Sequence, residues 1–176
     1  YTAARPIRFD RTGDMFYFDD QALTWMDQKL RHGILSPGPE NPFRDWSALV
    51  VSYTTADFHV GNGDFTYIAP DGSLAVIRHR GHRNARGLLA RAAALVPAPR
   101  RLLVAGMSAG AFGAAALAAE AAEHFPECRD VTCCPDSGLL LYSDWRYVVQ
   151  DVWKAEPRFW RPVRSPNLCL DWLRAF

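Results

Sequence analysis

The pattern of apolar and polar residues predicts alternating strands and helices through the middle of the chain. Residues 48–53, 102–105 and 131–134 are short, nearly continuous apolar stretches, as in strands that are buried on both faces. Helical periodicity covers residues 82–96, and strong helix formers fill residues 109–124. This βαβαβ order predicts an α/β fold with a mostly parallel sheet flanked by helices.

The flanking regions are less regular. Residues 65–68 and 74–77 surround Pro70-Asp71-Gly72, so they pair as a small hairpin or form the edges of a loop. Nearer the N-terminus we expect a strand at 15–18 and an amphipathic helix at 20–31. Four tryptophans in the last third belong either to the core or to the cover of a cleft, and the core is the more common place for such residues. They are Trp145, Trp153, Trp160 and Trp172.

Length and charge narrow the class of protein. With 176 residues, of which 49% are hydrophobic, the chain can fill the core of a single domain spanning 1–176. The formal net charge is +1 and both signs are interspersed, so we expect neither a nucleic-acid partner nor a membrane-binding face. No apolar stretch approaches the roughly 20 residues of a membrane span. The sequence carries no indication of oligomeric state.

Cysteine and histidine positions give weak signals. The four cysteines are Cys128, Cys133, Cys134 and Cys169. They are too few for a disulfide-dependent scaffold of this size, although Cys128 is spaced to close a small loop with Cys133 or Cys134. A vicinal pair such as Cys133-Cys134 is also found at metal sites, but no His or Cys follows at ligand spacing, so the pair is better interpreted as buried strand thiols. His79, His82 and Asp57 form a loose metal-ligand pattern, and a single His-x-x-His is weak. We expect no metal ion and no organic cofactor.

The strongest chemical signal is Gly106-Met107-Ser108-Ala109-Gly110, which joins a predicted strand to a predicted helix. A Gly-x-Ser-x-Gly turn in this context holds its serine in a cramped conformation and exposes the hydroxyl as a nucleophile. Gly106 and Gly110 leave room for neighbouring backbone. The alternative is a strand-to-helix turn that binds phosphate or nothing. Ser108 is therefore the candidate catalytic residue.

Several separated motifs resemble the pectin acetylesterases and their animal relative Notum, a carboxylesterase family, over residues 41–145. They are Asn41-Pro42-Phe43, the segment from Tyr53 to Gly61, Gly81 with Asn84, the elbow with Ala111, and Asp136-Ser137-Gly138. Thr54 and Ala56 replace a cysteine and a glycine of the family pattern. The disulfide that such a cysteine makes is therefore not expected.

The resemblance implies an α/β-hydrolase-like fold and a serine esterase. Ser108 would attack the carbonyl of an O-acetyl ester, on a small molecule or a polysaccharide, and the Ala109 N–H would help to hold the oxyanion. Asp57 and His59 either line the cleft or brace their own loop. The family analogy also suggests secretion or a periplasmic location.

The histidine and aspartate that complete such a triad are not evident. His124 follows Ser108 at the far end of the same predicted helix, about 24 Å away, and fits a structural place in the last turn. We therefore expect the catalytic Asp and His, and a glycine-rich oxyanion loop, to lie outside this sequence, which would then be incomplete at both ends. His59, His79 or His82 as base is the alternative within the chain. Other possibilities are a carbohydrate- or lipid-binding relative without catalysis, and a serine peptidase.

Overall fold

The computed structural model describes residues 31–53 and 55–176. The chain divides into two compact units, Tyr1–Val50 and Val51–Phe176. The strand expected at 15–18 and most of the helix expected at 20–31 lie outside the described residues. What is described is mixed α/β, with one antiparallel and one parallel two-stranded sheet.

In the first unit, a short 3₁₀ helix, η1 (Gly33–Leu35), precedes a loop organised by Asn41. The Asn41 amide donates to the carbonyl oxygens of Ile34 at 3.0 Å and Ser36 at 2.6 Å, and its Oδ1 accepts from Phe43 N at 3.1 Å. The Asn-Pro-Phe segment is thus a loop that is held by one buried amide.

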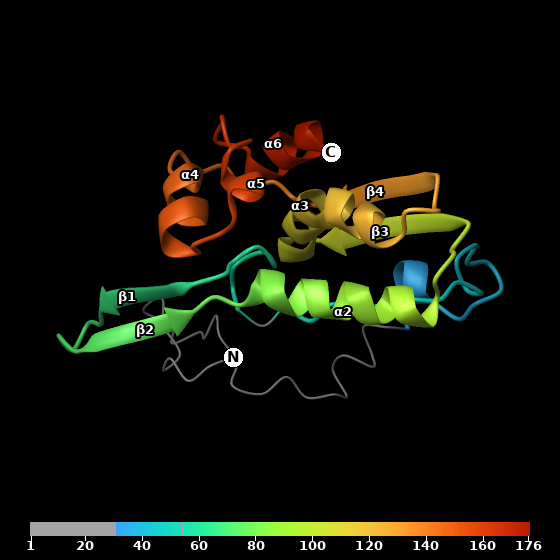
Figure 1. The fold of residues 1–176 in the computed structure, drawn as a ribbon, viewed down its shortest axis with the longest axis horizontal. Helices are drawn as coiled ribbons and strands as arrows, with labels where there is room; N and C mark the ends of the chain where they lie inside the picture. The colour runs from blue at the N-terminus through green and yellow to red at the C-terminus, as the bar shows by residue number, and fades with distance from the viewer. Residues whose placement is uncertain (1–30, 54) are drawn as a thin grey trace. The chain divides into compact units, whose positions relative to one another are not determined.

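The second unit begins with a hairpin and a helix (Figure 1). Strands β1 (Asp64–Ile68) and β2 (Leu74–Arg78) pair antiparallel. Gly72 has φ +81°, which a glycine adopts without strain, and its N–H closes the connecting turn on Ala69 O at 2.8 Å. Helix α2 (Gly81–Leu95) follows and ends before Pro97. Of the two alternatives for residues 65–68 and 74–77, the hairpin is the correct one, and the predicted helix is confirmed.

A β-α-β unit forms the centre of this part. Strand β3 (Arg101–Met107) lies parallel to β4 (Asp130–Asp136), and Val104 pairs with Cys133. Helix α3 (Ala109–His124) connects the two strands and packs against both of them (Figure 1). The expected elements are confirmed here, and both strands extend a few residues beyond their predicted ends.

Aromatic side chains fill the core beside α3. Short helical segments follow β4: α4 (Trp145–Tyr147), the π-helix η2 (Val148–Val152), α5 (Pro157–Trp160) and α6 (Leu168–Ala175). Phe58 stacks on Phe112 with ring centroids 4.3 Å apart, and Trp145 and Trp153 lie within 6 Å of Phe58. Trp172 is also buried. Trp145, Trp153 and Trp172 therefore belong to the core, as predicted, and the half-buried Trp160 packs against it.

One predicted strand is wrong. Residues 48–53 form no strand in the part of the chain that the structure describes, and Leu49 and Val50 are 43% and 40% exposed. An apolar sequence becomes a strand only when a neighbouring strand pairs with its backbone, and none of the described strands does so. Within the described residues, the parallel sheet therefore has two strands where three were expected.

Candidate functional site

Ser108 occupies the turn between β3 and α3. Its φ of 55° and ψ of −118° place a non-glycine residue in a sparsely populated region, which costs on the order of 1–3 kcal/mol. Two hydrogen bonds hold it there: Ser108 N donates to Asp136 O at 2.9 Å, and Ser108 O accepts from Ala111 N at 3.0 Å. The first ties the turn to β4 and the second begins α3. Ser108 itself is exposed.

The two elbow glycines differ in what surrounds them. A Cβ on Gly106 would collide with the Gly110 carbonyl group and lie 3.0 Å from Ala111 N, so the start of α3 approaches β3 too closely for any side chain. A Cβ on Gly110 would meet nothing within 4 Å. Contacts among the described residues thus explain why position 106 must be glycine, but they give no steric reason for glycine at position 110.

Ala109 stands at the start of α3, directly after the serine. The N–H of Ala111 makes the first hydrogen bond of the helix. The N–H of Ala109 comes before it in the chain and is therefore one of the N-terminal donors that have no partner within the helix. The positive end of the helix dipole adds to the attraction for a negative oxygen. The position suits a donor to an oxyanion that forms at Ser108.

Asp57 braces backbone. Its carboxylate is fully buried and accepts from His59 N at 3.1 Å and from Gly81 N at 3.0 Å. A Cβ on Gly81 would lie 2.7 Å from Asp57 Cγ, so glycine is needed where α2 begins. The carboxylate therefore fixes its own loop to the N-terminus of α2, where negative charge is favourable. These contacts fit the bracing interpretation of Asp57 given above.

The loop that carries Asp57 and His59 is strained and packs on the helix that follows Ser108. Ala56, Phe58 and His59 have φ of 52°, 48° and 64°. The His59 ring covers Gly113, where a Cβ would lie 2.6 Å from His59 Cδ2. Burial lowers the pKa of His59, and the Asp57 charge opposes this in part. Gly113 is about 7.5 Å along the helix axis from Ser108, and no hydrogen bond joins His59 to the serine among the described residues.

The other histidines of this unit have different partners. His79 Nδ1 lies 3.2 Å from Thr55 O and 3.8 Å from Asp57 Oδ2, and burial lowers its pKa against the opposing Asp57 charge. His82 Nε2 lies 2.7 Å from a Glu120 oxygen, more than three turns of α3 from Ser108. His124 Nδ1 hydrogen-bonds Glu120 O at 2.9 Å, in agreement with a structural place in the last turn. None of the three is positioned as a base for Ser108.

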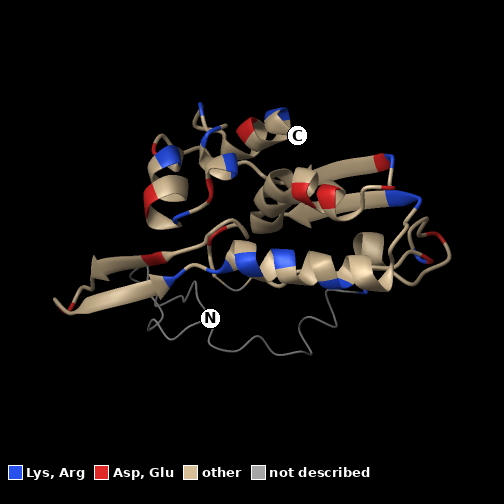
Figure 2. Ribbon diagram, viewed as in Figure 1, with Lys and Arg blue, Asp and Glu red and all other residues tan. Residues whose placement is uncertain are grey.

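A cluster of charged side chains around the buried Glu120 joins α2, α3 and the start of α5, and no sequence pattern predicted it. Glu120, 2% exposed, contacts His82 and lies 3.2 Å from Arg86 Nε and 3.8 Å from an Arg158 nitrogen. Burial alone would raise the pKa of Glu120, but the hydrogen bond with His82 and the nearby charges of Arg158 and Arg86 outweigh it and hold that pKa below the usual value. Figure 2 shows the basic residues of α2 and the acidic residues of α3. A single glutamate among alanines carried no pattern that predicts this burial.

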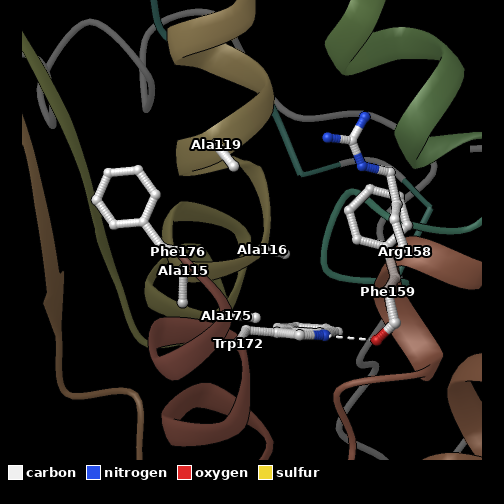
Figure 3. Close-up of a pocket in the computed structure, with 8 residues that line it drawn as sticks. All are labelled: Ala115, Ala116, Ala119, Arg158, Phe159, Trp172, Ala175 and Phe176. Atoms are coloured by element: carbon white, nitrogen blue, oxygen red, sulfur yellow. Dashed lines mark hydrogen bonds between the residues drawn. The ribbon is translucent and has the colours of Figure 1, made fainter.

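A small cavity lies away from Ser108, between α3, α5 and α6 (Figure 3). Its volume is about 140 Å³, and alanines of α3 lie opposite Phe159 and Trp172. Trp172 Nε1 donates to the backbone carbonyl oxygen of Phe159 at 2.7 Å, which ties the Trp172 ring to the backbone of α5. The cavity begins about 10 Å along α3 from Ser108, so it is separate from the elbow.

The cysteines are free thiols. Burial raises the pKa of Cys133 to about 11 and also raises that of Cys169. Cys128 forms no disulfide with either member of the vicinal pair. The prediction that this pair is buried is wrong for Cys134, which is exposed on β4, and Cys133 is half-buried. No group of three or more potential metal ligands gathers within residues 31–53 and 55–176.

Comparison of the chain with protein-family models, curated proteins and solved structures gave no match. In the part of the chain that is described, no helix has the length and apolar character that crossing a membrane requires.

Proposed function

We propose that this protein is a serine carboxylesterase with an α/β-hydrolase-like fold, which resembles pectin acetylesterases and hydrolyses O-acetyl esters. The observation that carries the proposal is the backbone of Ser108, strained at φ 55° between a parallel strand and a helix. Such strain persists only where surrounding structure enforces it, and it gathers at functional sites. Here Gly106 and the Asp136 carbonyl group enforce it.

In the proposed reaction Ser108 Oγ attacks the ester carbonyl carbon, while its proton passes to a base. The carbonyl oxygen becomes an oxyanion beside the Ala109 N–H, and removal of one such donor typically costs about 3 kcal/mol of barrier. Collapse of the tetrahedral intermediate expels the alcohol, which takes up a proton, and leaves an acyl-Ser108. Water then hydrolyses this ester and restores the serine. No metal ion or organic cofactor takes part.

The base is the component that the described histidines of the second unit do not supply. A serine hydroxyl without a base is a weak nucleophile, and the second unit places His59, His79 and His82 in contact with other groups. This observation favours one second candidate, a hydrolase-fold protein that binds a carbohydrate or lipid ester without cleaving it. The two candidates differ in whether Ser108 forms a covalent intermediate.

Hydrolysis of p-nitrophenyl acetate separates the candidates. The esterase releases p-nitrophenol with a rate that Ser108→Ala abolishes, whereas Ser73→Ala, an exposed serine in the hairpin turn, leaves the rate unchanged. If the unmodified protein and Ser108→Ala release p-nitrophenol equally, the esterase proposal is wrong and the binding candidate replaces it.

A further inference from the structure

Two arginines meet at one tryptophan on the surface of α4 and α5. Arg146 belongs to α4, Trp160 ends α5, and Arg161 follows it directly. The Cζ atom of Arg146 lies over the Trp160 ring, 5.0 Å from its centre, and that of Arg161 lies 5.7 Å from the same centre. Both arginines are exposed and Trp160 is half-buried. We refer to these three residues as the arginine–tryptophan cluster, and Figure 2 shows basic positions on both segments.

The positive charge of this cluster has no counter-charge among residues 31–53 and 55–176. Neither Arg146 nor Arg161 forms an ion pair there, whereas Glu123 holds the guanidinium of Arg158, also on α5, at 2.6 Å. The acidic residues of the same segments, which pair with neither arginine, are Asp144, Asp151 and Glu156. The face of the indole attracts each cation but does not neutralise it. The two guanidinium groups are therefore placed to share an anion.

The donors of the cluster suit a phosphate group. A guanidinium presents its N–H groups in a planar fork that matches two oxygens of a phosphate or a carboxylate. The two arginines carry two positive charges, and a phosphate monoester carries about −1.5 to −2 at pH 7, whereas a carboxylate carries a single negative charge. Trp160 Nε1 makes no hydrogen bond within the described residues and is not buried, so it is a further donor beside an apolar ring. The cluster thus offers donors for a dianion and an apolar surface for an organic group joined to it.

We propose that the arginine–tryptophan cluster binds a phosphate monoester: Arg146 and Arg161 hold the phosphate oxygens, and the organic group packs against Trp160. The indole distinguishes this ligand from free phosphate, which has no apolar part to remove from water. The three residues lie on elements other than those that form the Ser108 elbow. The site therefore does not depend on the proposed esterase function.

Isothermal titration calorimetry in a phosphate-free buffer at low salt compares three probes: phenyl phosphate, inorganic phosphate and benzoate. Phenyl phosphate is expected to bind at least about 5-fold more tightly than either of the others, because only this probe combines a dianion with an apolar ring. Arg146→Gln and Arg161→Gln are each expected to weaken its binding about 10-fold, and Arg146→Lys, which keeps the charge but not the planar fork, is expected to weaken it less. Arg91→Gln, at an exposed arginine of α2, is the matched control and leaves the affinity unchanged, as does Ser108→Ala.

An NMR titration locates the bound probe. The indole N–H signal of Trp160, assigned by its absence in Trp160→Phe, is expected to shift as phenyl phosphate is added. No binding at up to about 10 mM phenyl phosphate, equal weakening in Arg91→Gln, or benzoate that binds as tightly as phenyl phosphate overturns the proposal. Tighter binding of oligogalacturonide than of phenyl phosphate through the same arginines also overturns it, because the cluster then takes a polyuronate. None of these outcomes bears on Ser108, whose hydrolysis of p-nitrophenyl acetate is measured separately.

Discussion

Replacing Gly106 with alanine tests the geometry on which the elbow depends. The added methyl group would collide with the Gly110 carbonyl group and approach Ala111 N to 3.0 Å. These are backbone atoms at the start of α3, so they cannot turn aside as a flexible side chain can. Relief requires α3 to move away from β3, and α3 packs against both strands of the sheet.

The cost follows from the packing that this movement disturbs. Overpacking in a close-packed interior typically costs 1–3 kcal/mol, and sometimes more. For a protein of this size, 1 kcal/mol corresponds to roughly 2–4 °C in Tm. We therefore expect Gly106→Ala to lower Tm by about 2–12 °C. Gly110→Ala is the matched control, because its Cβ meets nothing within 4 Å and alanine is the better helix former.

Thermal unfolding followed by tryptophan fluorescence measures both variants, since Trp145, Trp153 and Trp172 lie in the core beside α3. The Tm of Gly110→Ala is expected to equal or slightly exceed that of the unmodified protein, with a gain of up to about 1 kcal/mol in the free energy of unfolding. The Tm of Gly106→Ala is expected to be well below that of the unmodified protein. Equal Tm values for the two variants would refute the close approach of α3 to β3 at the elbow.

Four further predictions concern buried or half-buried groups. Asp57→Ala leaves two backbone N–H groups without their acceptor and should lower the free energy of unfolding in urea by about 2–4 kcal/mol. Asp57→Asn, which keeps an acceptor oxygen, should lower it less. Small and equal decreases for the two variants would contradict the bracing role. Burial lowers the pKa of His59 in the folded protein below the unfolded-state value of 6.5. The stabilisation by neutral His59 is therefore complete above pH 6.5 and declines as the pH falls toward the folded-state pKa. An unfolding free energy that stays constant from about pH 7 to 5 would contradict this. Glu120, whose pKa is also lowered, adds a second decline below about pH 4.5, which Glu120→Gln should remove. With a pKa of about 11, Cys133 should react with a disulfide reagent at pH 8 at least 10-fold more slowly than the exposed Cys134, and comparable rates would contradict its burial.

Local sequence signals predicted the elements that surround Ser108. Residues 102–105 and 131–134 become strands because each pairs with the other, and the alanine-rich segment between them is long enough to cross from one to the other. The elbow was predictable because the atoms that exclude a side chain at Gly106 belong to Gly110 and Ala111, which are close in the sequence, and not to distant residues.

The parts that failed or were missed depend on contacts between distant residues. Residues 48–53 have the composition of a strand but no paired neighbour among the described strands, and composition does not supply one. Burial of Glu120 depends on His82 and Arg158, which are far away in the sequence. Nothing in the spacing of these residues predicts that they meet.

Covalent labelling of the serine tests the central claim most directly. The protein is treated with a fluorophosphonate that reacts with activated serines, digested, and examined by mass spectrometry. The esterase account predicts one phosphonyl group on the peptide that contains Ser108, and none on that peptide in Ser108→Ala. An unmodified Ser108 in a protein that hydrolyses p-nitrophenyl acetate, or a label on a different serine, would contradict it.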